Sequence, residues 1–185
     1  MRIEIADPAL DAQYIRHART ETLKAVCIDP QSANVEPVPI ATYLIAYDER
    51  TDQPIGMAES AMLQDVYGTY ANSPYASVTD LDAYCPISEM AGMRTVFVEP
   101  EYRSSSALFL ALTIGSAKLF YGRGARFGTA STRADDRYLN RLYQKMGGDR
   151  VGTFHGDSTS EPSSLFVIEL QKLSQHRCMK RVMSS

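Results

Sequence analysis

Tryptophan is absent from this sequence, and cysteine occurs only 3 times in 185 residues. The cysteines, Cys27, Cys85 and Cys178, are widely spaced and odd in number, so they form neither a secreted disulfide framework nor a zinc-binding motif. We therefore expect reduced thiols and a cytoplasmic location. Cys85 has no paired basic motif beside it, and such a lone cysteine is more often inert than nucleophilic.

The sequence also lacks an excess of basic charge and a long apolar run. The net charge is -3 and the pI is about 5.6, so no basic footprint for a nucleic-acid backbone is visible. Charged residues recur throughout residues 1–20, which leaves no apolar core for a signal segment. The longest apolar stretch, residues 107–119, contains Thr113, Ser116 and Lys118 and is too short to span a bilayer. We expect no nucleic-acid partner and no membrane association.

Apolar residues make up 44% of the chain and charged residues 22%, which is typical of a folded domain with a sizeable core. The length predicts a single domain over residues 1–173, followed by a frayed tail at 174–185. Within it, residues 63–88 form an insertion with four tyrosines and no sustained periodicity. This insertion either lines or covers a pocket, or is packed onto the surface by its own aromatic side chains.

Periodicity predicts alternating strands and helices along the rest of the chain. Asp7 and Pro8 are typical of the first residues of one helix, and Asp135 or Asp136 would cap another. The predicted strands are residues 1–6, 40–48, 55–62, 90–98, 125–132, 150–155 and 165–170, and the predicted helices are 8–26, 104–121 and 137–146. This order predicts an α/β or α+β fold with a mixed, mostly antiparallel sheet.

One candidate site is the junction between the strand at 90–98 and the following helix. The chain passes through Pro100 and Arg103 and then through three serines, Ser104, Ser105 and Ser106. The first N–H groups of such a helix are unpaired, so with an arginine nearby they suit a phosphate or pyrophosphate. An ordinary serine-capped helix would show the same local pattern.

A second candidate is the pair Asn140 and Tyr143, which lie three residues apart and therefore share one helix face. Taken alone, a tyrosine on a core face is usually packed there with a satisfied hydroxyl group. The histidines, His17, His155 and His176, are far apart and belong to no recognisable metal-ligand motif.

In this order and spacing, the two candidates resemble the donor-binding half of the GNAT superfamily of N-acyltransferases. The resemblance covers residues 96–152. The matching residues are Val98, Pro100, Tyr102 and Arg103 in the first motif, and Leu142, Tyr143, Lys145 and Gly147 in the second. It implies a GNAT-like mixed, mostly antiparallel sheet with one splayed strand pair, flanked by helices.

The resemblance also implies how an acyl donor is held and used. Main-chain groups of Val96, Phe97 and Val98 would bind the pantetheine arm, and an amide near Val98 would stabilise the tetrahedral oxyanion. Tyr143 would protonate the leaving thiolate as a general acid. Acyl-CoA or acyl-phosphopantetheine would be a co-substrate, with no bound cofactor and no metal. The loop that holds the donor's phosphates would consist of Arg103, Ser104, Ser105, Ser106, Ala107 and Leu108.

The sequence departs from the family pattern at several positions. Ser106 and Leu108 stand where the phosphate loop usually ends in small residues, and leucine does not allow the close backbone approach of glycine. Gly92 stands where this strand often carries a glutamate that acts as a base through water. The nearest acids, Glu59 and Glu89, are the candidates to relay the amine proton instead. Asn140 would take over the role of the asparagine that the helix motif usually has one turn earlier.

A branch-level likeness to acyl-homoserine-lactone synthases and N-acyl amino acid synthases makes acyl carrier protein an alternative donor and partner. An acidic carrier would need a basic rim, and the candidates for it are Arg103, Arg133, Arg137, Arg141 and Lys145. CoA would also use such residues for its phosphates.

The predicted function is transfer of an acyl group from a pantetheine thioester to the amine of a small molecule or amino acid by direct attack. The alternative is a non-catalytic domain of the same fold that binds a ligand or partner, and homodimer formation stays open. Arg16, Arg19 and Arg94 would either pair with an acceptor carboxylate or form ordinary exposed salt bridges.

Overall fold

The structure is a computed structural model that describes residues 1–25, 34–78, 80–104, 106–155 and 161–175. The chain divides into two compact units, and each is described by itself. The first comprises Met1–Ser60 and Arg94–Ser116, and the second comprises Ala61–Met93 and Ala117–Ser185. The predicted single domain over residues 1–173 stays a prediction. No helix in the described ranges is long and apolar enough to cross a membrane.

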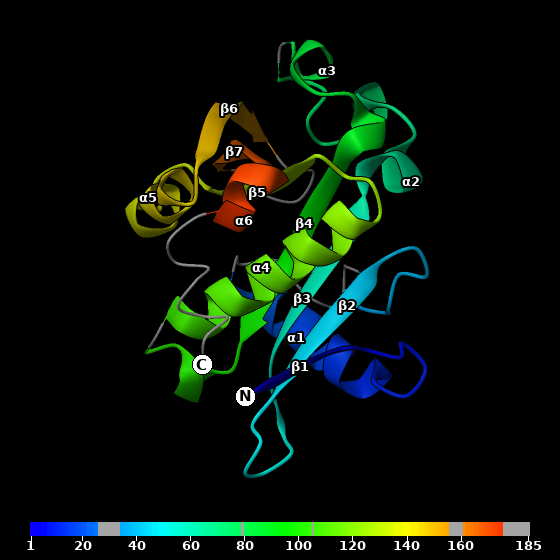
Figure 1. The fold of residues 1–185 in the computed structure, drawn as a ribbon, viewed down its shortest axis with the longest axis vertical. Coiled ribbons are helices and arrows are strands. Elements are labelled where there is room, and N and C mark those ends of the chain that lie inside the picture. The colour runs from blue at the N-terminus through cyan, green and yellow to red at the C-terminus, as the bar shows by residue number, and fades with distance from the viewer. Residues whose placement is uncertain (26–33, 79, 105, 156–160, 176–185) are drawn as a thin grey trace. The chain divides into compact units, whose positions relative to one another are not determined.

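The first unit holds the N-terminal elements (Figure 1). It contains β1 (Arg2–Ile5), α1 (Ala12–Ala25), β2 (Thr42–Tyr47), most of β3 (Pro54–Met62), the second half of β4 (Met90–Val98), a 3₁₀ turn (Pro100–Tyr102) and the first part of α4 (Ser106–Gly122).

The second unit holds the insertion and the C-terminal elements. It contains α2 (Leu63–Tyr67), a 3₁₀ turn (Tyr70–Asn72), α3 (Leu81–Tyr84), a 3₁₀ turn (Ile87–Glu89), the first half of β4, the end of α4, β5 (Phe127–Arg133), α5 (Arg137–Lys145), β6 (Gly148–His155), β7 (Pro162–Glu169) and α6 (Leu170–Gln175).

The seven strands are hydrogen-bonded in the order β1-β2-β3-β4-β5-β7-β6. The pairs β1–β2, β2–β3, β5–β7 and β6–β7 are antiparallel, and the pair β4–β5 is parallel. The parallel register joins Met90–Gly92 to Phe127–Thr129, so it covers only the first three residues of each strand. The predicted fold class, a mixed and mostly antiparallel sheet flanked by helices, is therefore confirmed.

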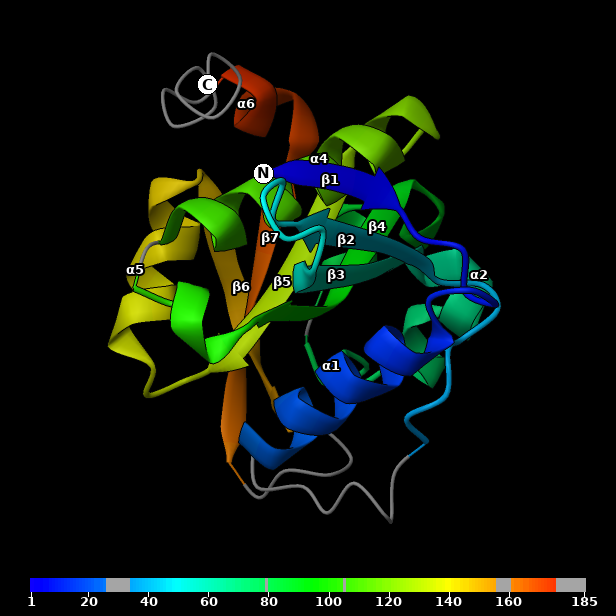
Figure 2. The same ribbon diagram turned by 90° about the horizontal axis from the view of Figure 1, so that it is seen from below.

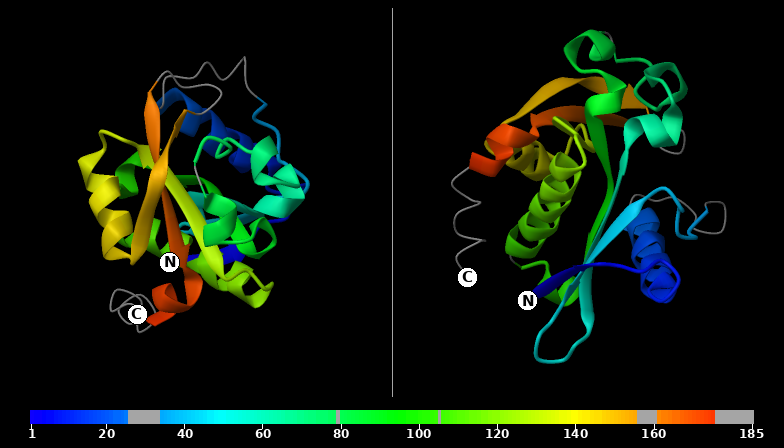
Figure 3. Two further views of the ribbon diagram at one scale, coloured as in Figure 1. Left: turned by 90° about the horizontal axis from the view of Figure 1, so that it is seen from above. Right: turned by 45° about the vertical axis from the view of Figure 1, so that its right-hand side comes forward.

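In the first unit, α1 packs its apolar stripe beside the β2–β3 hairpin (Figures 2 and 3). Ile15 and Ala18 are fully buried, and they share a core cluster with Tyr43, Ile45 and Met57. The helical spacing of its apolar residues predicts this face correctly, because positions three or four apart lie on one side of a helix.

The predicted start of that helix at residue 8 is wrong, because the helix begins at Ala12. The Asp7 side chain accepts a hydrogen bond from the Ala9 N–H at 2.8 Å, and the Asp7 carbonyl accepts one from the Asp11 N–H at 2.8 Å. These bonds close a separate turn that Asp7 stabilises, and Leu10 is left 84% exposed outside the core.

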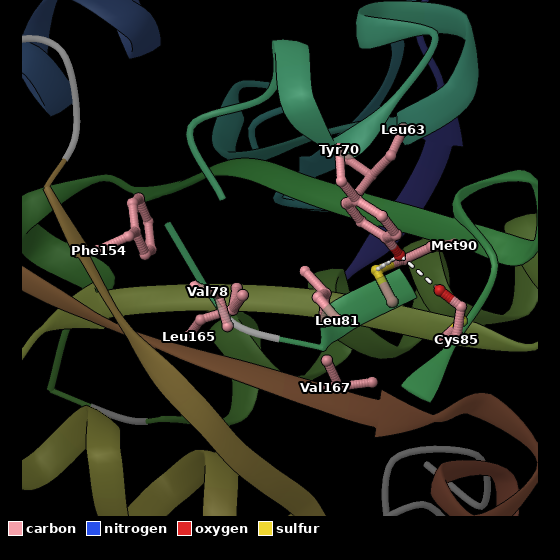
Figure 4. Close-up of a cluster of buried hydrophobic side chains, with 9 residues drawn as sticks. All are labelled: Leu63, Tyr70, Val78, Leu81, Cys85, Met90, Phe154, Leu165 and Val167. Carbon is pink, nitrogen blue, oxygen red and sulfur yellow. Dashed lines mark hydrogen bonds between the residues drawn. The ribbon is translucent and has the colours of Figure 1, made fainter. Parts of the chain in front are cut away.

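In the second unit, the insertion contributes to the core (Figure 4). Tyr70, Val78 and Leu81 belong to one buried cluster with Met90 of β4, Leu165 and Val167 of β7 and other apolar residues. The Tyr70 hydroxyl donates to the Cys85 carbonyl at 2.9 Å and also lies 3.3 Å from the Met90 sulfur. These contacts favour the interpretation of residues 63–88 as a segment packed down by its own aromatic side chains.

α5 follows β5 in the second unit and lies beside β6 and β7 (Figures 1 and 3). Asp136 caps it, as predicted: the carboxylate accepts a hydrogen bond from the Leu139 N–H at 2.9 Å. The chain leaves the helix at Gly147, whose φ of +83° is a conformation that favours glycine.

Candidate active site

The residues that the sequence singles out fall into both units. Glu59 and residues 96–108 lie in the first unit, whereas Glu89, Asn140 and Tyr143 lie in the second. Within each unit the structure shows what surrounds these side chains, so the candidate active site is built from two separate sets. Ser105 lies outside the described residues.

The end of β4 is closed by Arg103. Its guanidinium Nε donates a hydrogen bond to the Val98 carbonyl at 2.7 Å, and its charge lies 5.6 Å from the centre of the Phe97 ring. Phe97 is almost fully buried, and the N–H of Glu99 pairs with the Ile55 carbonyl at 3.0 Å. Arg103 thus fixes the strand end where the resemblance places the oxyanion-stabilising amide.

The start of α4 explains why leucine stands at position 108. Leu108 is buried, and a Cβ on Gly56 of β3 would lie 3.4 Å from its side chain and 3.1 Å from Leu112. The Leu108 side chain therefore fills space above a glycine in the core of the first unit. Ser104 and Ala107 are exposed and Ser106 is half-buried, whereas phosphate binding at this loop stays a prediction.

Glu59 is the most unusual group of the first unit. Its carboxylate is in the interior of β3, opposite Tyr43 of β2, and its side chain is only 1% exposed. Two arginines flank it: Arg19 Nε lies 3.8 Å from Oε2, and Arg94 Nε lies 3.5 Å from Oε1. Oε1 has no hydrogen-bond partner among the described residues. A buried carboxylate oxygen without a hydrogen bond is costly for the fold.

The two arginines differ in what else they bind. Arg19 donates to the Glu36 carbonyl at 2.7 Å and to the Asn34 carbonyl at 3.0 Å, which ties α1 to the segment before β2. Arg94, 30% exposed, has Glu59 as its only ion-pair partner among the described residues. Arg16, by contrast, forms an exposed ion pair with Glu36 at 3.1 Å.

A further ionisable group, the His17 imidazole, lies at the β4 end, outside the motifs found in the sequence. His17 Nε2 is 3.3 Å from the Glu99 carboxylate, and the His17 ring meets the Phe97 ring edge-on, with 5.6 Å between centres. Burial, and then the negative charge of Glu99, raises the pKa of Tyr14. Glu99 thus joins α1 to the end of β4 through polar contacts.

In the second unit, Tyr143 points from α5 into the core. Its side chain is 4% exposed, and its ring lies 5.5 Å from the ring of Phe166 on β7. Burial raises the pKa of the Tyr143 hydroxyl well above its usual value, and the charge of Asp136 adds to this effect. The phenol is therefore neutral near pH 7 and has a proton to donate.

Asn140 holds the turn between β5 and α5. Its side-chain amide donates to the Arg133 carbonyl at 3.0 Å and to the Asp136 carbonyl. The role that the structure gives its amide group is to position the helix that carries Tyr143. A direct contact of Asn140 with a donor stays a prediction.

Glu89 is more exposed than Glu59 and already paired. Arg126 Nη1 lies 3.3 Å from its carboxylate, and the Arg126 N–H donates to the Glu89 carbonyl at 2.8 Å. Nearby, burial raises the pKa of Cys85 to about 12, which makes the thiol inert at neutral pH. Within the described ranges, no three His, Cys, Asp or Glu side chains are grouped so that they could hold a metal ion.

The missing glutamate of β4 has a steric explanation. A Cβ on Gly92 would lie 2.5 Å from the Leu63 side chain and 3.4 Å from the Thr129 hydroxyl oxygen. Leu63, the first residue of α2, is itself almost fully buried. The insertion therefore occupies the space that a longer side chain at this strand position would need.

The exposed face of α5 carries the other basic candidates. Arg137, Arg141 and Lys145 recur at every fourth residue, are exposed and form no ion pair with any described residue. Arg133, in contrast, pairs with Asp135 at 2.8 Å and with Glu161 at 3.1 Å. Arg137, Arg141 and Lys145 thus form a basic stripe that is available to a polyanion.

No protein-family model matches the sequence, and no curated protein matches it. Several solved structures, however, are similar to this chain. Arabidopsis thaliana NAA60 in complex with acetyl-CoA is 18% identical, with a TM-score of 0.64 over 92% of this chain and 98% of that chain. The spermidine/spermine N-acetyltransferase SpeG from Vibrio cholerae is 10% identical, with a TM-score of 0.61 over 95% and 96%. The CoA-dependent acyl-homoserine lactone synthase MesI is 13% identical, with a TM-score of 0.59 over 94% of each chain.

At these identities the similarity concerns the fold. It agrees with the mixed sheet order and the short parallel register of β4 with β5. The chain has the fold of the GNAT N-acetyltransferases.

Proposed function

We propose that this protein is an N-acyltransferase, which moves an acyl group from a pantetheine thioester to the amine of a small molecule. The observation that carries the proposal is Glu59, a buried carboxylate with one unpaired oxygen, in a fold whose solved neighbours are N-acetyltransferases. A purely structural domain of this fold has no need to bury such a group.

The proposed donor is acyl-CoA. Two solved neighbours support it, one in complex with acetyl-CoA and one named as CoA-dependent. Its phosphates would bind at residues 103–108, where Ser104 and Ala107 are exposed. The basic stripe formed by Arg137, Arg141 and Lys145 suits either the 3′-phosphate of CoA or an acidic carrier protein.

The proposed reaction is direct attack without a covalent enzyme intermediate. The neutral amine nitrogen attacks the thioester carbonyl carbon, and backbone N–H groups near Val98 stabilise the oxyanion. The carbon–sulfur bond then breaks, and the leaving thiolate takes a proton from Tyr143. The amine loses its proton to Glu59, and exchange with solvent returns Glu59 and Tyr143 to their starting protonation states, so the products are an amide and a free thiol.

A thiol-release assay tests this proposal. Acetyl-CoA and longer acyl-CoAs, and the same acyl groups on acyl carrier protein, are incubated with primary amines and amino acids while free thiol is measured. The proposal expects release that depends on the acceptor and falls in Tyr143→Phe and Glu59→Gln. Thioester binding without any turnover, unchanged by Tyr143→Phe, would instead favour the non-catalytic binding domain.

Separating the two donors needs a second comparison. Arg137→Glu and Arg141→Glu together reverse the charge of the stripe. If a carrier protein is the donor, the double substitution lowers the activity with the carrier far more than the activity with a short N-acetylcysteamine thioester. Equal loss of activity with both donors would mean that these arginines do not bind the carrier.

A further inference from the structure

We infer that the acceptor carries a carboxylate beside its amine, as an α-amino acid does, and that Arg94 binds this carboxylate while Glu59 binds the amine. This inference rests on the proposed function and names the substrate class of the same site. It is carried by two neighbouring groups of the first unit that have unused binding capacity, the Glu59 Oε1 atom and the Arg94 guanidinium.

The distances show that these two groups do not fully satisfy each other. Arg94 Nε lies 3.5 Å from Glu59 Oε1, and no hydrogen bond joins them, so the buried Oε1 accepts no hydrogen bond from any described residue. A native ion pair of this kind normally has shorter, charge-assisted hydrogen bonds. Oε1 therefore keeps the capacity to accept a hydrogen bond from a ligand group.

Arg94 is the residue that is able to turn toward a ligand. Arg19 is held by the carbonyls of Asn34 and Glu36 and is only 14% exposed, so its position is fixed by the protein itself. The Arg94 side chain is 30% exposed and has no described ion-pair partner except Glu59. When an amine takes the place of the Arg94 Nε beside Oε1, the planar guanidinium needs a new anion, and a carboxylate fits it in two parallel hydrogen bonds.

The net charge of this cluster agrees with such a ligand. Glu59 carries one negative charge, and Arg19 and Arg94 carry one positive charge each, so the group is positive by one. An amino acid in its reactive form, with a neutral amine and an ionised carboxylate, is negative by one and neutralises the group. A simple amine does not, and it offers the Arg94 guanidinium no anion to bind.

Matched acceptors test this inference. Each L-amino acid is compared with its amide and with the amine that lacks the carboxylate, at saturating acyl donor. We expect kcat/KM for the best amino acid to exceed that for its amide by at least 100-fold. Arg94→Gln should reduce this preference to within about 3-fold, mainly through KM for the amino acid, since a lost bidentate pair removes binding rather than chemistry.

Two further variants make the result specific. Arg94→Lys keeps the charge but lacks the planar fork, so it should retain part of the preference. Arg16→Gln is the matched control, because within the described residues Arg16 forms an ion pair only with the exposed Glu36, and it should leave the preference unchanged.

The outcomes separate this inference from the proposed function. If the wild type acylates amides and simple amines as well as amino acids, the enzyme is an acyltransferase and the inference is wrong. The inference is also wrong if Arg94→Gln lowers the rates with all acceptors equally. If no acceptor releases thiol, the proposed function fails, and calorimetric titration of the same amino acids decides the inference by itself: binding that Arg94→Gln abolishes supports it, and no binding refutes it.

Discussion

Replacement of Glu59 by glutamine distinguishes a functional carboxylate from a structural ion pair. The side chain keeps its size and loses its charge. Removing one partner of a well-formed buried ion pair usually costs about 3–5 kcal/mol, because the other charge is left buried and unpaired. If Glu59 served only the fold, a loss of that size would be the result.

The geometry predicts a much smaller loss of stability. The distances from Glu59 to Arg19 and Arg94 are 3.8 Å and 3.5 Å, and Oε1 has no hydrogen bond to lose. Without the carboxylate, Arg19 keeps its two backbone carbonyl partners, and Arg94 reaches water because it is 30% exposed. We therefore expect Glu59→Gln to change the free energy of unfolding by no more than about 1 kcal/mol.

The activity, in contrast to the stability, should fall strongly. An amide side chain is not able to accept the amine proton, so we expect a loss of about 100- to 10,000-fold in the rate of thiol release. Urea unfolding gives the stability from the midpoint and the slope, and the thiol-release assay gives the rate on the same preparation. Glu36→Gln is the control, since its carboxylate is 61% exposed and, among the described residues, forms an ion pair only with Arg16. A loss of 3 kcal/mol or more in Glu59→Gln, or full activity, would refute this reasoning.

Two further predictions concern the second unit. Tyr143→Phe keeps the ring contact with Phe166 and removes only the hydroxyl group, so it should cost about 0.5–1.5 kcal/mol in urea unfolding while lowering kcat about 100-fold. Because burial raises the pKa of Tyr143, its neutral acid form persists at alkaline pH, so a pH–rate profile should show no loss from phenol ionisation near the usual value of about 10. Gly92→Ala places a Cβ 2.5 Å from Leu63 and should cost about 1–3 kcal/mol in urea unfolding, whereas Gly122→Ala, with no atom within 4 Å, should be neutral or stabilising. Equal effects of the two glycine substitutions would contradict the steric explanation for Gly92.

Elements with strong local signals are predictable from the sequence almost to the residue. The strand predicted at 90–98 is β4, Met90–Val98, because an apolar run there ends at Pro100, which is unable to continue a ladder. The helix predicted at 137–146 is α5, Arg137–Lys145, because Asp136 caps its start and glycine follows its end. In both cases the information is contained within a few neighbouring residues.

The start of α1 shows where local signals compete. Asp7 followed by Pro8 is a good helix start, but Asp7 is also a residue that closes tight turns through its own side chain. The structure uses the second option, since the Asp7 carboxylate binds the Ala9 N–H and the helix begins only at Ala12. In both options the Asp7 side chain accepts a hydrogen bond from a backbone N–H that follows it, so the pattern alone is insufficient to choose between them.

The candidate site depends on long-range contacts, and Glu59 illustrates this best. The sequence offers it only as an acid near a strand end, equal in standing to Glu89. The two acids differ in burial and in their neighbours. Glu59 lies among buried residues along β3, whereas Glu89 is a third exposed and forms an ion pair with Arg126. The arginines beside Glu59 come from α1 and β4, far from it along the chain, and nothing local to either one indicates a shared carboxylate. A charged residue inside a strand of small and apolar residues is nevertheless a useful signal in the sequence. Burying such a charge is costly, so it indicates an ion-pair partner or a functional role.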